Sequence, residues 1–171
     1  MAKGLPKGGR TLAAGLALVL VLAGSLVAAQ AAAGEAKPPA KPSPANKCPV
    51  CGMFVAGYQD FLAAVVFKDG TTAYFDGCKD MFRFLFDVGT YAPGRKRADV
   101  GSIWATDYYS LSWIDAAAAL FVRGGDILGP MGRELIPFGK DAEAKEFMKD
   151  HKGEALFHFA EVTPDILKDI D

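Results

Sequence analysis

The middle of the chain carries one order of secondary-structure patterns twice, which limits the folds available to it. Residues 61–67 (Phe-Leu-Ala-Ala-Val-Val-Phe) are an uninterrupted apolar run, typical of a buried strand, and Asp69-Gly70 is a hairpin turn signal before a second strand at 71–75. A helix is expected from Gly77, and a strand at 103–109 completes this half. The helix has apolar residues at helical spacing, which are Cys78, Met81, Phe82 and Leu85.

The second half has the same order of strand, turn, strand, helix and strand. Its expected elements lie at 120–122, 134–138, 141–149 and 155–159. Between the halves, residues 112–115 are a weak helix-capping signal before an alanine-rich turn or short helix. Strands that alternate with short helices favour an α+β fold over a doubly wound sheet. The sequence therefore predicts two consecutive β-β-α-β units, built as small mixed sheets that each pack one helix.

The first 33 residues have the composition of an export signal. Three basic residues precede an uncharged apolar run at 11–29, and small residues ending at Ala31 or Ala33 fit a cleavage site. The run approaches the roughly 20 apolar residues that span a bilayer, so an uncleaved membrane anchor at 1–33 is the alternative. Ser25 stands where a bacterial lipoprotein carries its acylated cysteine, so lipidation is not expected.

Residues 34–46 are rich in proline, alanine and lysine without apolar periodicity, and are expected to be a semi-extended tether. A single globular domain at 47–163 and a short tail at 164–171 follow. The formal net charge is −1, and it becomes −4 without residues 1–33, which carry three basic residues and no acidic one. No basic stripe remains, which argues against nucleic-acid binding.

Two thiols and a thioether fall within six residues, in Cys48-Pro49-Val50-Cys51-Gly52-Met53. Sulfur ligands select soft metals such as Cu(I), or zinc and iron–sulfur centres. A structural disulfide and a redox pair are the alternatives in an exported protein. A redox pair normally opens a helix that follows a strand, whereas this motif follows a proline-rich tether. A metal role is therefore favoured, and Met53 is either a ligand or a core thioether.

Four further residues are considered as metal ligands. Met131 lies in Gly129-Pro130-Met131-Gly132, either as a cap over the core or as a soft ligand displayed on a loop. Cys78 is expected to be buried as a small hydrophobe, although a ligand role is open because it begins a helix. His151 and His158 are expected to be surface histidines unless one of them binds a metal.

Three aspartates flank the first helix and are interpreted as capping and solvated charges; they are Asp76, Asp80 and Asp87. Asp76 is positioned to cap a helix that begins at Gly77. The sequence has no Ser/His/Asp pattern, phosphate-binding glycine loop or paired-carboxylate motif. A binding protein is therefore favoured over an enzyme.

Several motifs follow one another in a recognisable order. They are Cys48-Pro-Val-Cys51-Gly-Met53, Tyr74-Phe75-Asp76-Gly77-Cys78, Trp113-Ile114-Asp115-Ala116, Gly129-Pro-Met131-Gly132-Arg133-Glu134-Leu135 and His151-Lys152-Gly153. Together they resemble the NosL family of nitrous-oxide reductase accessory proteins, over residues 47–162. The resemblance implies two related β-β-α-β units. It also implies a periplasmic Cu(I)-binding chaperone that delivers copper for the catalytic copper–sulfide cluster of maturing nitrous-oxide reductase.

The same resemblance implies ligands and partners. Cys51 and Met131 match the family's cysteine and methionine ligands, Cys48 and Met53 are auxiliary candidates, and His151 is the candidate nitrogen ligand. The implied partners are the copper ion, apo nitrous-oxide reductase and other maturation proteins, with a membrane tether if the N-terminal segment is retained. The alternatives are an exported thiol–disulfide oxidoreductase that uses Cys48 and Cys51, and a structural or zinc-binding module.

Overall fold

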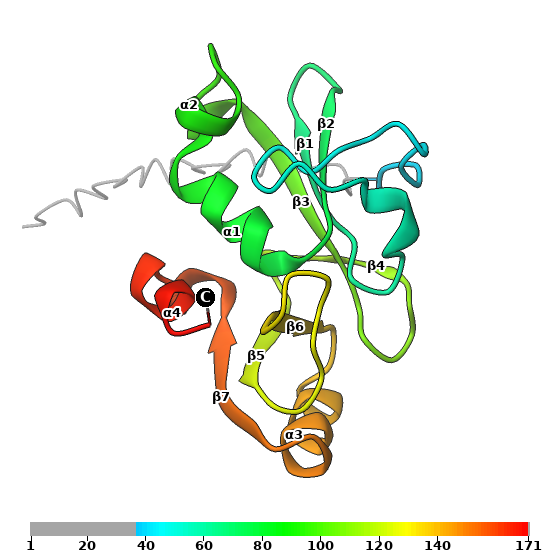
Figure 1. Cartoon of the computed structure of the whole chain (residues 1–171), viewed down its shortest axis with the longest axis vertical. Coiled ribbons are helices and arrows are strands. Elements are labelled where there is room, and N and C mark those ends of the chain that lie inside the picture. Colours follow the sequence, from blue (N-terminus) through cyan, green and yellow to red (C-terminus); the bar gives the residue numbers. More distant parts are fainter. Residues whose placement is uncertain (1–36, 171) are drawn as a thin grey trace, which may run out of the picture. The chain divides into compact units, whose positions relative to one another are not determined.

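The computed structural model describes residues 37–170, and its first half is a four-stranded sheet in the order β2-β1-β3-β4 (Figure 1). β1 (Ala63–Phe67) is largely buried and forms a hairpin with β2 (Thr72–Phe75). On its other edge β1 pairs with β3 (Val100–Thr106), and β4 (Trp113–Asp115) extends the sheet beyond β3. The apolar run that predicts a buried strand is therefore the centre of this sheet.

Helices connect β2 to β3. α1 (Cys78–Phe86) buries the apolar face that its residue spacing predicts. Asp87 ends α1, and its carboxylate accepts a hydrogen bond from the Thr90 N–H, so it caps α2 (Val88–Tyr91), a helix that the sequence does not predict. Short 3-10 turns precede β1 and β3, at Val55–Gly57 and Arg97–Asp99.

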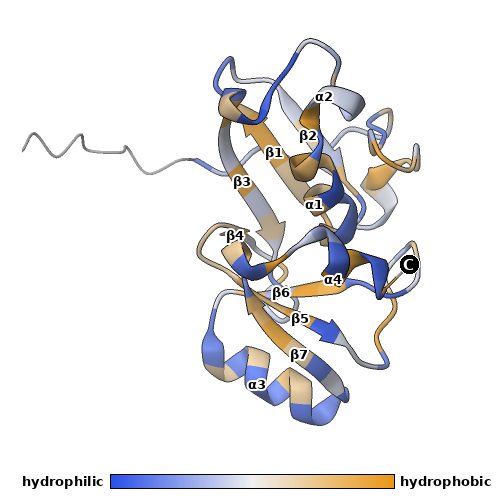
Figure 2. Cartoon of the chain, turned by 90° about the vertical axis from the view of Figure 1, so that its left-hand side faces the viewer, coloured by the Kyte–Doolittle hydropathy of each residue, from blue (hydrophilic) through white to orange (hydrophobic). Residues whose placement is uncertain are grey.

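The second sheet has three strands in the order β6-β5-β7. β5 (Leu120–Gly124) pairs with β6 (Leu135–Phe138) on one edge and with β7 (Gly153–His158) on the other. α3 (Asp141–Asp150) connects β6 to β7, and Figure 2 shows hydrophobic and hydrophilic residues alternating along it, as in a helix with one packed side. A 3-10 turn, Phe159–Glu161, follows β7.

Both halves share one topology, as the repeated sequence pattern predicts. In each, the first strand is central, the second is its hairpin partner, and the strand after the helix pairs with its free edge. The strands on either side of the helix are not neighbours, because the first strand lies between them. The two strands that the helix connects are both antiparallel to the first strand, so they run parallel to each other without pairing. All adjacent pairs are antiparallel. The α+β fold with two β-β-α-β units is confirmed, and the expectation of mixed sheets is wrong.

β4 and α4 are among the elements not expected from the sequence. β4 occupies part of 112–115, where the sequence suggests a helix cap, because this stretch hydrogen-bonds along β3; the alanine-rich turn follows it. α4 (Pro164–Lys168) lies in the stretch expected to be a short tail. Leu167 and Ile170 are buried there, so the C-terminal segment contributes to the core.

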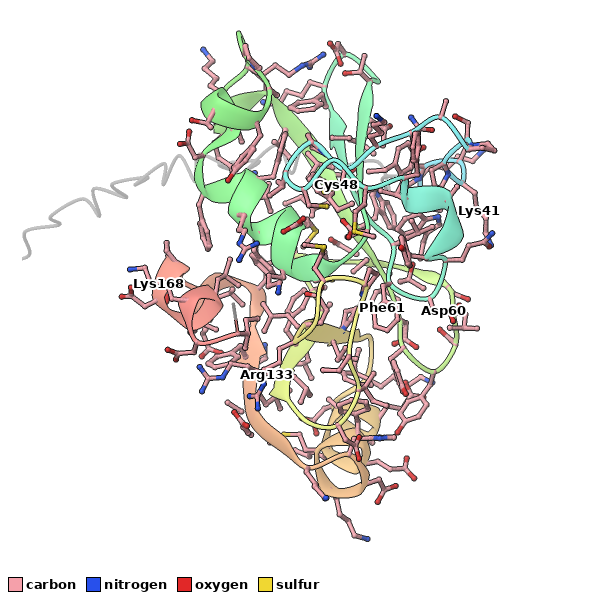
Figure 3. The ribbon with its side chains drawn as sticks, in the orientation of Figure 1. Lys41, Cys48, Asp60, Phe61, Arg133 and Lys168 are labelled. Atoms are coloured by element: carbon pink, nitrogen blue, oxygen red, sulfur yellow. The ribbon has the colours of Figure 1, made fainter. Side chains whose placement is uncertain are left out.

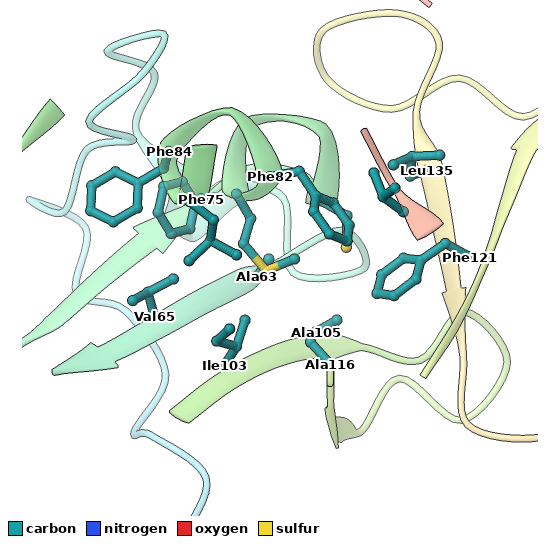
Figure 4. Close-up of a cluster of buried hydrophobic side chains, with 14 of the residues drawn as sticks. Ala63, Val65, Phe75, Phe82, Phe84, Ile103, Ala105, Ala116, Phe121 and Leu135 are labelled. Carbon is teal, nitrogen blue, oxygen red and sulfur yellow. The ribbon is translucent and has the colours of Figure 1, made fainter. Parts of the chain in front are cut away.

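One hydrophobic core runs through both halves, with α1 between them (Figure 4). The ring centroid of Phe82 in α1 lies 5.0 Å from that of Phe121 in β5, and the centroid of Phe84 lies 5.1 Å from that of Phe75 in β2. Both pairs meet edge to face, a favourable aromatic geometry. A smaller cluster fills the space between α3 and the second sheet. α1 therefore joins the two β-β-α-β units.

The described residues include only part of the N-terminal segments that the sequence predicts. The signal-peptide, anchor and Ser25 predictions concern residues outside the described part of the chain. Within residues 37–170, no helix is long and apolar enough to cross a membrane. The described end of the expected tether has no regular structure up to Pro42, and the Ala40 carbonyl accepts a hydrogen bond from the Tyr74 hydroxyl at 2.8 Å.

Replacing Phe82 with alanine tests whether α1 joins the two halves. Phe82→Ala removes a fully buried ring, so we expect the free energy of unfolding in urea to fall by about 3–5 kcal/mol. Phe86→Ala is the matched control on the same helix, because Phe86 is 43% exposed; we expect it to cost less than about 1 kcal/mol. Equal losses for the two variants would contradict the assignment of the core.

Candidate metal centre

The motif Cys48-Pro49-Val50-Cys51 lies in a tight loop closed by backbone hydrogen bonds. Lys47 and Phe54 form an antiparallel bridge, and the Cys48 N–H donates to the Met53 carbonyl at 2.8 Å. The Gly52 N–H donates to the Cys48 carbonyl at 2.9 Å, and Gly52 has a φ of 80°, which glycine adopts without strain. The loop brings the two sulfur atoms within 4.8 Å of each other.

The start of α1 faces this loop with two carboxylates. The Cys48 thiol donates to Asp80 Oδ2 at 3.3 Å, and the Cys51 thiol donates to Asp76 Oδ1 at 3.2 Å. One ligand atom from each of these four residues lies within 4.8 Å of the other three. We call this group the thiol–carboxylate cluster. Figure 3 shows Cys48 on the side of its loop that faces α1, beside other sulfur atoms.

Asp76 and Asp80 are not the solvated charges that the sequence suggests. Their relative exposures are 1% and 2%, and Asp76 does not cap α1, whose N-cap residue is Gly77. Arg83 offsets one charge, since its Nη1 lies 3.1 Å from Asp80 Oδ1. Buried carboxylates need such partners because desolvating an unpaired charge is costly. Two carboxylates beside two thiols make the cluster a favourable place for a cation.

Burial raises the pKa of both thiols. The pKa of Cys51 is raised to about 11, mainly by desolvation and less by the nearby carboxylates of Asp80 and Asp76. The pKa of Cys48 is raised further, again mainly by desolvation. The backbone N–H groups of Val50 and Cys51 oppose this shift, because they hydrogen-bond to the Cys48 sulfur and favour its thiolate. Both thiols are therefore protonated at neutral pH, and a cation that replaces the protons finds donors already in place.

A glutamate from the second half of the chain occupies the N-terminus of α1. The carboxylate of Glu134 is buried and accepts hydrogen bonds from the backbone N–H groups of Lys79 and Leu135. Gly77 provides the space, since a Cβ at this position would overlap the Glu134 carboxylate. Desolvation raises the pKa of Glu134 to about 7. The helix end is thus satisfied by a side chain distant in sequence rather than by Asp76.

The predicted methionine ligands lie on loops near the cysteines or α1. Met131 is 45% exposed, on the loop that leads to Glu134. Its carbonyl accepts a hydrogen bond from Lys79 Nζ at 3.1 Å, so this loop contacts the turn of α1 that carries Asp80. Met53 is half-buried in the cysteine loop itself. Their roles as ligands stay predictions, whereas Cys48 and Cys51 are brought together directly.

His151 lies outside the thiol–carboxylate cluster. It is the residue after α3, its Nδ1 lies 3.0 Å from Asp126 Oδ1, and its ring stacks on Phe147 with centroids 4.6 Å apart. The structure does not bring His151 together with the two thiols, and its role as a nitrogen ligand stays a prediction. His158 is exposed, as expected of a surface histidine. Cys78 is buried at 1% exposure, as expected of a small hydrophobe, and all three cysteines are free thiols.

The interpretation of the sequence missed Asp76 and Asp80 as members of the site. One sequence signal could have found them. Asp76 directly precedes the N-cap residue of α1 and Asp80 lies in its first turn, so the two carboxylates belong to the same helix end. Their direction toward the cysteines, however, depends on how the N-terminal loop packs on α1, which the local sequence does not specify.

The fold and the cluster define a class of protein, an α+β protein that presents two thiols and two carboxylates as one set of metal-ligand atoms. The sequence model of the NosL family matches residues 39–167, and the chain therefore belongs to the NosL family. No curated protein matches the chain.

Solved structures similar to this chain include those of two NosL proteins. The crystal structure of the copper chaperone NosL from Shewanella denitrificans is 25% identical, has a TM-score of 0.59, and covers 74% of this chain and 99% of that one. The solution structure of apo-NosL from Achromobacter cycloclastes is 20% identical, has a TM-score of 0.44, and covers 61% of this chain and 87% of that one.

Alkylation tests the environment of the thiols. We expect iodoacetamide to modify Cys51 before Cys48 and Cys78, because only Cys51 is partly exposed. Since the thiolate is the nucleophile and the pKa of Cys51 is about 11, its rate should still rise about tenfold between pH 9 and pH 10. Mass spectrometry of the native protein measures this rate, with Cys51→Ser as the control. A rate that levels off near the ordinary cysteine pKa of about 8.5 would contradict the raised pKa.

Proposed function

We propose that this chain is a Cu(I)-binding metallochaperone, a binding and delivery protein rather than an enzyme. The observation that carries the proposal is the thiol–carboxylate cluster, in which Cys48 and Cys51 offer two sulfur atoms within 4.8 Å. Thiolates are soft ligands that suit Cu(I). Membership of the NosL family supports the proposal, because a relative with a solved structure is described as a copper chaperone.

The unequal exposure of the two cysteines suits delivery. Cys48 is 1% exposed and held by backbone donors, whereas Cys51 is only partly buried. We propose that copper enters and leaves at Cys51, where a partner's ligand can exchange with it, while Cys48 retains the ion. Met131, exposed on the neighbouring loop, is the proposed third ligand, and Met53 is an auxiliary one. A closed cage of four cysteines would hold the metal too firmly for transfer.

The proposed destination of the copper is nitrous-oxide reductase, during assembly of its catalytic copper–sulfide cluster. This step rests on the order of the motifs and on membership of the family. We further propose that the protein acts in the periplasm, exported or anchored through residues 1–33, without lipidation at Ser25. Its partners there would be the apo-reductase and other proteins of the same maturation pathway in denitrification.

Serine substitutions test the thiol ligands. We expect Cys51→Ser and Cys48→Ser each to weaken Cu(I) binding by more than about 100-fold, because loss of a direct ligand exceeds the roughly 10–100-fold effect of losing a group that only orients one. Competition with a chromophoric Cu(I) chelator under anaerobic conditions measures the affinity. Cys78→Ser is the matched control, since Cys78 is outside the cluster, and its affinity should stay within about threefold if it folds.

The same variants separate the alternatives. Unchanged Cu(I) affinity in both Cys48→Ser and Cys51→Ser would contradict the proposal. Insulin reduction that is lost in Cys48→Ser but kept in Met131→Leu would favour a thiol–disulfide oxidoreductase. Zinc that remains bound through purification and resists replacement by Cu(I) would favour a structural zinc module, for which two thiolates and two carboxylates are acceptable ligands.

The affinity for Cu(I) should rise with pH. Both thiols have raised pKa values, so each is protonated between pH 6 and pH 8 and loses its proton when copper binds. For each thiolate formed, binding should strengthen about tenfold per pH unit. With two thiolates, the affinity for Cu(I) should therefore rise about 10⁴-fold between pH 6 and pH 8. The thiols are hydrogen-bonded to the carboxylates of Asp80 and Asp76, which stay in place when the thiol protons leave. An affinity that does not change from pH 6 to pH 8 would contradict thiolate ligation.

A further inference from the structure

We propose that Lys79 and Glu134 are positioning residues, which hold Met131 beside the thiol–carboxylate cluster and thereby set the affinity for Cu(I). The inference rests on the proposed function, in which Met131 supplies a third sulfur ligand. Its basis is a set of contacts that join the first turn of α1 to residues 129–134.

Met131 sits at the tip of a tight turn. The Gly129 N–H donates to the Gly132 carbonyl at 2.8 Å, and the Gly132 N–H donates to the Gly129 carbonyl at 3.1 Å. Gly132 has a φ of 85°, so the turn needs glycine there. Pro130 and Met131 are the two residues between these bonds. These two hydrogen bonds close the turn, and the position of Met131 therefore depends on what holds the turn as a whole.

The side chain of Lys79 is the first link between the turn and α1. Its exposure is only 3%, and its Nζ donates to the carbonyls of Met131 at 3.1 Å and Ile170 at 3.2 Å. A buried ammonium is costly unless it is hydrogen-bonded and close to an opposite charge, which Glu134 provides. Lys79 directly precedes Asp80, so this link fixes the turn relative to the cluster.

The backbone of Lys79 makes the second link. Its N–H donates to the buried carboxylate of Glu134, three residues after Met131. The two ends of the 131–134 segment are thus attached to one residue of α1, one through its side chain and the other through its main chain. Two such links restrict both the distance and the orientation of the turn. The 45% exposure of Met131 itself shows that the arrangement does not serve to bury its side chain.

The alternative is that Lys79 only stabilises the fold and does not position Met131. Lys79 also bonds to Ile170, so its loss could loosen the C-terminal segment without acting on Met131. Arg123 offers a matched control, because its Nη1 pairs with Asp169 Oδ2 at 2.8 Å and ties down the same segment. Arg123→Met should lower the melting temperature and leave Cu(I) affinity unchanged.

The test is a double-mutant cycle of Lys79→Met and Met131→Leu, read by anaerobic Cu(I) competition at pH 7. We expect Lys79→Met, which removes a group that only positions a ligand, to weaken binding about tenfold, and Met131→Leu, which removes the proposed ligand itself, to weaken it more. The double variant should be no weaker than Met131→Leu alone, because Lys79 acts through Met131. Lys79→Arg, which keeps a cation, should recover part of the lost affinity. Independent effects that add in the double variant would overturn the inference.

Further variants keep the inference testable. If circular dichroism shows that Lys79→Met does not fold, the same cycle is run with Glu134→Gln. This substitution should weaken Cu(I) binding in the wild-type background and have no further effect in the Met131→Leu background. Unchanged affinity in Met131→Leu together with loss in Cys51→Ser would overturn this inference and leave the proposed function standing. Unchanged affinity in Cys51→Ser would overturn the proposed function itself.

Discussion

The carboxylate of Glu134 at the N-terminus of α1 is the contact on which the rest of the site depends. A helix begins with backbone N–H groups that have no partner within the helix, and a buried helix end needs another acceptor. Glu134 supplies it from the second β-β-α-β unit by accepting the Lys79 N–H, and Gly77 leaves the space. The same helix end carries Asp80 and faces the cysteine loop. The contacts of Lys79 with Glu134 and with the Met131 carbonyl thus hold the second half of the chain against the helix end that carries Asp80.

The polar groups around α1 are buried together, so each depends on the others. Lys79 and Asp80 are 3% and 2% exposed and Glu134 is 5% exposed, yet each has a charged or hydrogen-bonding partner in the structure. In a region of low dielectric constant such a network is favourable only when its members are satisfied. Aromatic packing of Phe82 on Phe121 holds the two units in the register that this network requires. A site built in this way can present thiols to a cation while the scaffold beneath them stays fixed.

The sequence predicts what depends on local periodicity. The apolar run before Asp69-Gly70 becomes the central strand, and the spacing of Met81, Phe82 and Leu85 gives the buried face of α1. The sequence does not reveal contacts made across the fold. Asp76 has the local pattern of a helix cap, yet it turns toward Cys51 because Glu134 already occupies the helix end. The absence of mixed pairing follows from β1 and β5 lying between the strands that their helices connect, which is likewise a property of the tertiary arrangement.

X-ray absorption spectroscopy of the Cu(I)-loaded protein at the copper K-edge identifies the atoms bound to the metal. We expect a first shell made mainly of sulfur, with a sulfur scatterer lost in Cys51→Ser and in Cys48→Ser and none lost in Cys78→Ser. A first shell of oxygen and nitrogen atoms that is the same in all three variants would contradict the assignment of the thiol–carboxylate cluster as the copper site.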